Sequence, residues 1–299
     1  AEYNLNTGKK YIRELFSNDS FYSIPEYQRP YVWQKEQIEI LLEDLTNAME
    51  QNKEKEYFLG CMIWNTKQTT KKNEKYKYQD ILDGQQRFIT LYLLQGVLRD
   101  LSTDKGLKEQ VNERLIQEEN EFQELPKRNR IVFDIRDDAE FFDTFLLPNN
   151  GTLHLTDIEK TVQEKKNSTS VRNMANAIIV MTKWWKVKER EQGENYQKYI
   201  KEFYIYLSNR VLALFLATPD NLDDAYNLFT VLNNRGLQLQ ASDILRAQNL
   251  REIKDSDSRK KYAESWNNYV DSVGYPFKSF DEFLWSIVFI KMKYILKKC

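Results

Sequence analysis

The sequence contains few of the residues that build disulfide frameworks, metal clusters or phosphate-binding glycine loops. Its 299 residues include two cysteines, one histidine, nine glycines and six prolines. Cys61 lies in an apolar run and Cys299 is the last residue, so the pair forms neither a disulfide framework nor a zinc cluster. None of the glycines lies in the GxxxxGK(S/T) frame of a P-loop, which excludes that class of nucleoside triphosphatase.

The chain also lacks an excess of either charge and any long apolar run. Its 44 basic and 45 acidic residues give a formal net charge of −1, so contact with nucleic acid must be local. The longest late apolar run, residues 285–290, is too short to span a bilayer, and no signal peptide is visible. We therefore expect a soluble, cytoplasmic protein with no membrane partner. Hydrophobic residues make up 41% and aromatic residues 13%, which is enough for a sizeable core.

Hydrophobic spacing predicts an α+β protein. Residues 34–51 have helical spacing, and two strand-like runs at 57–65 and 76–82 flank a polar stretch, which indicates a β-hairpin with a long loop. Further strands are expected at 130–135 and 210–218, and a polar surface loop or subdomain boundary at 161–170. The remaining predicted helices cover residues 171–191, 196–207, 242–253, 259–273 and 280–296.

These elements predict two parts. A small mixed sheet in residues 1–106 is joined to a larger helical part in residues 107–299.

The sequence DGQQR, Asp83 to Arg87, stands where the second hairpin strand runs into a helix. Such a junction offers unpaired backbone N–H groups and a positive helix end to a phosphate. Gly84 allows close approach, Gln85 and Gln86 can donate hydrogen bonds or orient water, and Arg87 can neutralise charge. Asp83 is the candidate for holding a magnesium ion or acting on an attacking water. The alternative is a loop with a structural glycine and a solvated arginine.

Two other segments have both functional and structural interpretations. In SIPEYQRPYVW, Gln28 and Arg29 lie between aromatic residues, so a guanidinium and a ring could bind phosphate and base; equally, the rings could pack on the next helix. In the later segment at 227–247, Asn233 and Arg235 precede Gly236 at the end of a helix. An ordinary helix-turn-helix connection explains that pattern, and a DNA-reading unit is the alternative.

Together these segments resemble one family, the N-terminal domain of the GmrSD-type modification-dependent (type IV) restriction enzymes. It is related to the DGQQR-containing subunits of phosphorothioate-sensing phage defence. The stretches that carry the resemblance occur in the family's order: IPEYQRPYVW, YFLGCMIW followed by ILDGQQRFITL, NRIVFDIRDDAEFFDTFL, and FTVLNNRGLQLQASDILRA.

The resemblance implies a ParB/sulfiredoxin-like core whose DGQQR loop binds a nucleoside triphosphate with Mg²⁺ and supports its hydrolysis. The catalytic set it implies is Asp83, Gln85, Gln86 and Arg87, with Asp83 as the metal ligand. The nucleotide-binding set is Gln28, Arg29, Gly84, Arg87, Asn233 and Arg235. Gly236 and Asp243 also match the later motif, and Arg235 is our candidate for coupling the nucleotide to the helical part.

The resemblance also implies partners: modified DNA and an HNH-type nuclease domain in cis or trans. HNH chemistry needs a histidine base, and the single histidine, His154, lies in a polar stretch where a surface position is expected. The chain begins with Ala and ends in KMKYILKKC, so we expect a fragment from which the cutting domain was removed. The alternative function is a non-enzymatic module in which DGQQR grips the phosphate of modified DNA.

Overall fold

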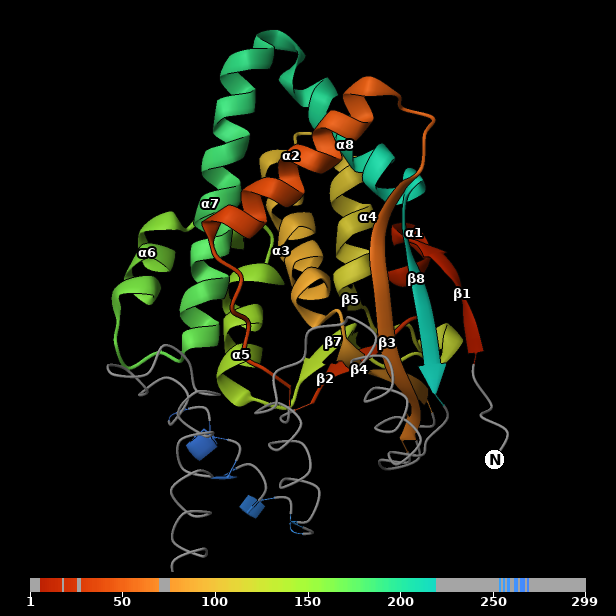
Figure 1. Ribbon diagram of the computed structural model, residues 1–299, viewed down its shortest axis with the longest axis vertical. Coiled ribbons are helices and arrows are strands. Elements are labelled where there is room, and N and C mark those ends of the chain that lie inside the picture. The colour runs from red at the N-terminus through yellow and green to blue at the C-terminus, as the bar shows by residue number, and fades with distance from the viewer. Residues whose placement is uncertain are drawn as a thin grey trace, which may run out of the picture. The chain divides into compact units, whose positions relative to one another are not determined.

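The computed structural model describes residues 6–17, 19–25, 28–69 and 76–218, together with residues 253, 255, 257–258, 261–262, 264–266 and 268. The chain divides into two compact units, Ala1–Pro25 with Tyr31–Ala225, and Glu26–Pro30 with Tyr226–Cys299. The elements described below belong to the first unit (Figure 1). The helices predicted for 242–253, 259–273 and 280–296 fall wholly or mostly outside the described residues.

A six-stranded sheet organises the first unit. Its strands are β1 (Asn6–Tyr11), β2 (Tyr22–Ile24), β3 (Tyr57–Thr69), β4 (Tyr76–Asp83), β7 (Ile131–Phe133) and β8 (Val211–Thr218), in the order β1-β8-β3-β4-β2-β7. β1 pairs with β8 and β3 with β4 in antiparallel fashion, whereas β3–β8, β2–β4 and β2–β7 are parallel. The mixed sheet and the α+β class predicted from the sequence are thus confirmed. β5 (Ile116–Gln117) and β6 (Arg128–Asn129) form a separate two-stranded ladder.

The sheet takes strands from distant parts of the chain. The hairpin of β3 and β4 is the one that the sequence predicts, and β7 and β8 lie within the two predicted later strands. Both later strands follow the boundary predicted between residues 106 and 107, which falls in the first turn of α4. The long-range pairing of β8 with β1 and β3 therefore joins both predicted parts in one sheet.

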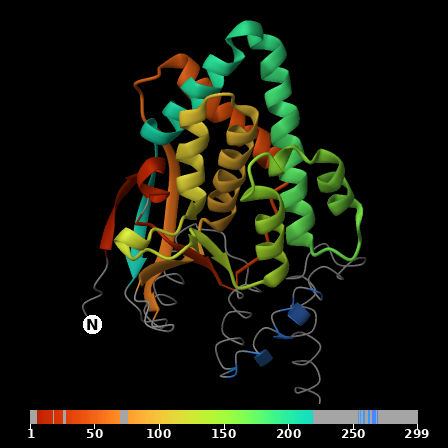
Figure 2. The same cartoon turned by 180° about the vertical axis from the view of Figure 1, so that it is seen from behind.

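Helices pack beside the sheet and on one another (Figures 1 and 2). They are α1 (Ile12–Leu15), α2 (Lys35–Gln51), α3 (Gln85–Leu101), α4 (Lys105–Leu115), α5 (Arg136–Phe141), α6 (Leu155–Gln163), α7 (Thr169–Gln192) and α8 (Tyr196–Arg210). Side chains cap several of them: Asp104 Oδ1 accepts from Leu107 N at 2.9 Å, and Ser168 Oγ accepts from Val171 N at 3.2 Å. None of the helices that the structure describes has the length and apolarity needed to cross a bilayer.

The core is centred on α3, which lies between α4 and α7 in both views (Figures 1 and 2). Every residue from Gln85 to Asp100 is buried except Arg87. A helix that is buried on all sides belongs to the interior of a protein. Its Phe88 and Tyr92 pack against the ring of Phe16, with ring centroids 5.1 and 4.6 Å away. The start of α3, where DGQQR lies, is therefore held firmly.

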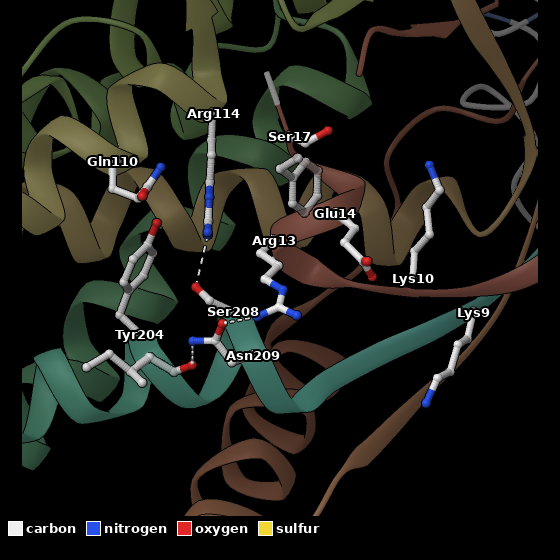
Figure 3. Close-up of a pocket in the computed structure, with 12 residues that line it drawn as sticks. Lys9, Lys10, Arg13, Glu14, Ser17, Gln110, Arg114, Tyr204, Ser208 and Asn209 are labelled. Carbon is white, nitrogen blue, oxygen red and sulfur yellow. Dashed lines mark hydrogen bonds between the residues drawn. The ribbon is translucent and has the colours of Figure 1, made fainter. Parts of the chain in front are cut away.

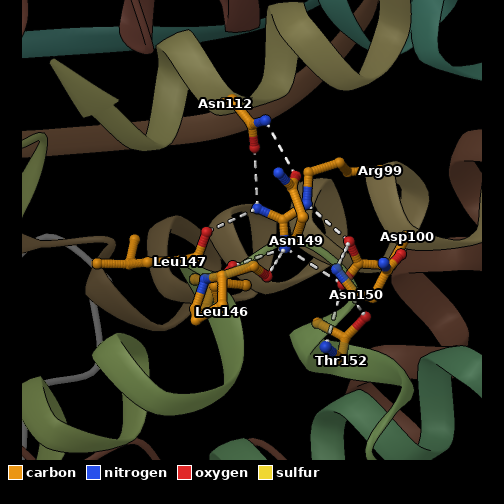
Figure 4. Close-up of polar contacts among 9 residues, drawn as sticks. Arg99, Asp100, Asn112, Leu146, Leu147, Asn149, Asn150 and Thr152 are labelled. Carbon is orange, nitrogen blue, oxygen red and sulfur yellow. Dashed lines mark hydrogen bonds and ion pairs between the residues drawn. The ribbon is translucent and has the colours of Figure 1, made fainter. Parts of the chain in front are cut away.

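A buried ion pair fixes the other end of α3. The side chains of Arg99 and Asp100 are 0% and 1% exposed, and Arg99 Nε donates to Asp100 Oδ1 at 2.7 Å (Figure 4). Arg99 also donates to the backbone carbonyls of Leu146, Leu147 and Pro148. Asp100 in turn accepts from the backbone and hydroxyl of Thr152. Because the charges satisfy each other and the surrounding backbone, this pair ties the segment after α5 to the core.

Candidate functional site at the start of α3

DGQQR forms the junction that the sequence predicts: Asp83 ends β4, Gly84 makes the turn, and α3 starts at Gln85. Gly84 has φ 86° and ψ 6°, a left-handed conformation that favours glycine. A Cβ there would lie 3.0 Å from Met62 Cγ and 3.3 Å from the carbonyl oxygen of Cys61, so β3 closes the space behind the loop. Gly84 has no side chain to cap α3, and the first-turn amides receive no side-chain cap.

Arg87 clasps β3. Its Nη1 donates to the carbonyl of Leu59 at 2.8 Å and its Nη2 to the carbonyl of Cys61 at 3.0 Å. The residue between these two carbonyls, Gly60, has φ 125°, and the pairing of β3 with β8 shifts register here. A Cβ on Gly60 would lie 1.7 Å from Nη1 of Arg87. A bulge of β3 and a glycine thus make room for the guanidinium, which is partly exposed.

Gln86 joins α3 to the segment that enters α2. The side chain is 7% exposed, and its Oε1 accepts from the backbone N–H of Val32 at 2.8 Å. Its backbone carbonyl accepts from Thr90 Oγ1 at 2.7 Å, and that hydroxyl meets the Tyr31 hydroxyl at 2.8 Å. Tyr31 is 1% exposed and reaches α3 with its hydroxyl group, and Trp33 packs on the core.

Asp83 and Gln85 differ from these neighbours. Among the described residues, neither side chain makes a hydrogen bond or an ion pair. Asp83 is partly exposed and Gln85 is 4% exposed. The polar atoms of Gln85 are not among the fully buried ones, so the amide can still exchange hydrogen bonds with water or with a ligand. Gly84, Gln86 and Arg87 therefore shape the loop, while Asp83 and Gln85 remain available for a ligand.

A polar network behind the loop has no signal in the sequence motifs. Tyr31 N donates to Ser170 Oγ at 3.1 Å, and Ser170 Oγ donates to Asp138 Oδ2 at 2.8 Å. Asp138 is 3% exposed, and burial raises the pKa of its carboxyl group to about 7. Asp138 lies in the family-like stretch that begins NRIVFDIRDD, so the resemblance marked the segment, but only the fold assigns this residue a contact.

The structure does not place the remaining predicted site residues at DGQQR. Gln28 and Arg29 belong to the second compact unit, so the structure does not relate them to DGQQR. His154 is exposed at the start of α6, as the sequence predicts. Four residues of the later motif lie outside the described residues: Asn233, Arg235, Gly236 and Asp243.

The residues present suit magnesium delivered with a nucleotide. Within the part of the chain that the structure describes, no group of three or more His, Cys, Asp or Glu side chains could hold a metal by itself. Magnesium is commonly held by one or two carboxylates and completes its shell with phosphate oxygens and water. A single carboxylate, Asp83, beside uncapped helix amides fits that mode of binding.

Comparison with known families decides the relationship. A family model described as the GmrSD restriction endonuclease N-terminal domain matches residues 12–250. The chain belongs to this family. A search of curated proteins finds no match. The matched region includes DGQQR, the residues that hold it in place and the later motif, so the resemblance inferred from the sequence is confirmed. Membership makes this the N-terminal domain of a modification-dependent restriction enzyme, a family that acts with a restriction nuclease on DNA.

Proposed function

We propose that the chain binds a nucleoside triphosphate with magnesium at DGQQR and supports its hydrolysis, as a regulatory domain of DNA restriction. One observation carries the proposal. Where β4 meets α3, the side chains of Asp83 and Gln85 make no hydrogen bond or ion pair among the described residues, beside helix amides without a side-chain cap. A carboxylate, an amide and a positive helix end are groups that a magnesium triphosphate can use.

Each residue then has a separate task. The α3 amides bind phosphate oxygens, and Asp83 holds the magnesium ion, which when bound neutralises phosphate charge. Gln85 orients the water that attacks the terminal phosphorus, so that the bond to the bridging oxygen breaks and a nucleoside diphosphate and inorganic phosphate leave. Gln86 and Arg87 keep the loop in shape through Val32 and β3.

The test is calorimetric titration of the chain with each of the four ribonucleoside triphosphates, in magnesium and in EDTA, together with phosphate-release assays with and without modified duplex DNA. Asp83→Asn is expected to weaken magnesium-dependent binding about 10-fold or more, because a charge-assisted contact contributes roughly 1.5–3 kcal/mol. Gln85→Ala is expected to lower hydrolysis more than binding.

Asp157→Asn is the matched control. It makes the same chemical change at an exposed aspartate on α6 and should leave binding unchanged. Nucleotide binding and turnover that are equal in wild type, Asp83→Asn and Gln85→Ala would remove the assignment. If the wild type binds no nucleotide but binds modified duplex DNA, and Asp83→Asn changes that binding, then DGQQR binds a phosphate of the DNA instead.

A further inference from the structure

A polar cavity, which none of the DGQQR residues lines, opens between β1, α1, α4 and α8 (Figure 3). Its volume is about 750 Å³. The residues that determine its chemistry are Lys10, Arg13, Arg114, Tyr204 and Ser208. All four elements belong to the first compact unit, so the cavity is part of one packed body.

Four basic side chains line this cavity, and only one of them, Lys9, has an acidic partner among the described residues: it pairs with Glu56 at 3.6 Å. Among the described residues, neither Lys10, Arg13 nor Arg114 has a carboxylate within ion-pair distance. Arg13 donates to Asn209 Oδ1 at 3.0 Å, and the carboxylate of Glu14, which also lines the cavity, accepts from the backbone of Tyr11. The lining thus has four basic side chains against one carboxylate, which gives the cavity an excess of positive charge in a chain whose formal charge is −1.

An adjacent hollow of about 360 Å³ shows the contrast. It also contains two basic residues besides Arg13, but Lys53 pairs with Glu202 at 2.7 Å and Arg210 pairs with Glu54. Lys53 and Arg210 of the smaller hollow thus have carboxylate partners, whereas Lys10 and Arg114 of the larger cavity have none among the described residues. This difference points to an anionic ligand in the larger cavity.

Arg114 is the strongest feature of the larger cavity. The residue is only 6% exposed, and burial lowers the pKa of its guanidinium group. Its Nη1 donates to Ser208 Oγ at 3.0 Å and to Gln95 Oε1 at 3.4 Å, and its Cζ lies 5.1 Å from the centre of the Tyr204 ring. In Figure 3 the guanidinium points from α4 toward Ser208 on α8. A buried cation with only neutral partners is costly, and an anion would offset that cost.

The hydroxyl of Tyr204 is a second, independent indication. Tyr204 is 6% exposed, and its buried hydroxyl group makes no hydrogen bond of good geometry among the described residues, although Ser208 and Arg114 lie close enough to affect it. Burial raises its pKa, and the positive charge of Arg114 opposes that rise, so the group stays a protonated donor at neutral pH. A buried donor beside a buried guanidinium and a serine hydroxyl forms a set complementary to an oxyanion.

We infer that this cavity is a binding site for a small phosphate-bearing ligand, separate from the proposed nucleotide site. A phosphate group would bond to Arg114, Tyr204 and Ser208, with Arg13 and Lys10 adding charge nearer the opening. A volume of about 750 Å³ is ample for a ligand of nucleotide size. The buried position of Arg114 favours a compact ligand over a DNA backbone, which is contacted mainly by exposed side chains.

Inorganic pyrophosphate is the probe, titrated calorimetrically into the whole chain in EDTA, so that magnesium-dependent binding at DGQQR is suppressed. Tyr204→Phe and Arg13→Gln are each expected to weaken pyrophosphate binding about 10-fold, because each removes one hydrogen bond to a charged group. Both variants keep the ring or stem that packs in the fold. Arg114→Gln is expected to abolish binding, and circular dichroism will show whether that variant is folded.

Two control variants distinguish binding in this cavity from binding at DGQQR and from a general effect of surface charge. Lys35→Gln removes one exposed charge on α2 and should leave pyrophosphate binding unchanged, and Asp83→Asn should do the same. Equal pyrophosphate affinity in wild type, Tyr204→Phe and Arg13→Gln would overturn the inference. So would wild type that binds a short DNA duplex but no pyrophosphate, with duplex binding lost in Arg13→Gln, because the cavity would then contact DNA.

Discussion

Asp138 brings a carboxyl group into the interior where α5 meets the first turn of α7. Its Oδ2 accepts from Ser170, and its Oδ1 has no partner among the described residues. Ser170 accepts in turn from the backbone of Tyr31, whose hydroxyl reaches Thr90 on α3. The protonation state of one buried acid is thereby connected to the helix that carries DGQQR.

The stability of the fold should depend on pH through this residue. Burial raises the pKa of Asp138 from 3.8 to about 7, so between these values the folded chain keeps a proton that the unfolded chain loses. Raising the pH through this window favours unfolding, by at most about 1.4 kcal/mol per pH unit. Above pH 7 the contribution is constant. Asp138→Asn cannot titrate, so its free energy of unfolding should rise relative to that of wild type from pH 4 to pH 7.

Urea unfolding of both proteins at pH 4.5, 5.5, 6.5 and 7.5 measures this difference directly. Taking the difference cancels the other titrating groups. A difference that stays constant over this range would show that Asp138 is already ionised in the folded protein.

Arg87 holds strand β3 and helix α3 together. Among the contacts between elements, this one affects the site most. Two hydrogen bonds from a charged group join the start of α3 to a bulge in β3. The same strand pairs with β4 on one side and β8 on the other. A change at DGQQR can therefore reach both neighbouring strands through the backbone of β3.

Substitution of Arg87 should lower stability. Arg87→Lys keeps the charge but cannot span the carbonyls of Leu59 and Cys61, and we expect a loss of roughly 1.5–3 kcal/mol in the free energy of unfolding. Gly60→Ala should have a comparable effect, since its Cβ would displace the guanidinium from a position 1.7 Å away. Asp83→Asn, by contrast, should change stability by less than about 0.5 kcal/mol.

Chemical denaturation of the three variants distinguishes the two tasks within DGQQR. If Arg87→Lys were as stable as wild type, the two hydrogen bonds from Arg87 to β3 would contribute nothing to the stability of the fold. Arg87 would then serve only to bind a ligand.

The roles of individual site residues show where sequence reasoning stops. The junction of β4 and α3 and the need for Gly84 follow from local patterns, so both were predictable. From the motif alone, Arg87 is expected to serve a ligand, as a cation that neutralises charge. The hydrogen bonds to Leu59 and Cys61 change that expectation, because they join residues 26 and 28 positions apart. Likewise, Gln86 accepts from Val32, 54 positions earlier, which no local motif reveals.

Two of the strands, β1 and β2, are not predicted from the sequence, and the reason is again that the deciding contacts are distant in the sequence. β1 has the sequence NTGKKY, which is polar, and β2 has three residues, so neither has the length or alternation of a recognisable strand. β1 becomes a strand because it pairs with β8, about 200 residues later in the chain. Long helices such as α2, α3 and α7 were predictable because their apolar spacing is local.

At the scale of the whole molecule, the sheet brings together strands from distant parts of the matched family region. β3 and β4 lead into DGQQR, and β3 also pairs in parallel with β8, the last described strand before the later motif. A bound nucleotide can shift an equilibrium in the later motif only by its difference in affinity for two arrangements.

The proposed function implies that the chain does not cut DNA by itself, and that is the prediction for the chain as a whole. HNH nucleases use a histidine as general base beside a metal ion. The one histidine here, His154, is exposed at the start of α6, in a segment held by the Arg99–Asp100 pair and far in sequence from DGQQR. Purified chain, incubated with modified and unmodified plasmid in magnesium and each nucleotide, is expected to leave both intact.

His154→Ala should then match wild type in nucleotide hydrolysis, since the residue has no part in either reaction. Cleavage that copurifies with the chain and disappears in His154→Ala or Asp83→Asn would show that the nuclease site lies within these 299 residues, and the division between control and cutting would have to be redrawn.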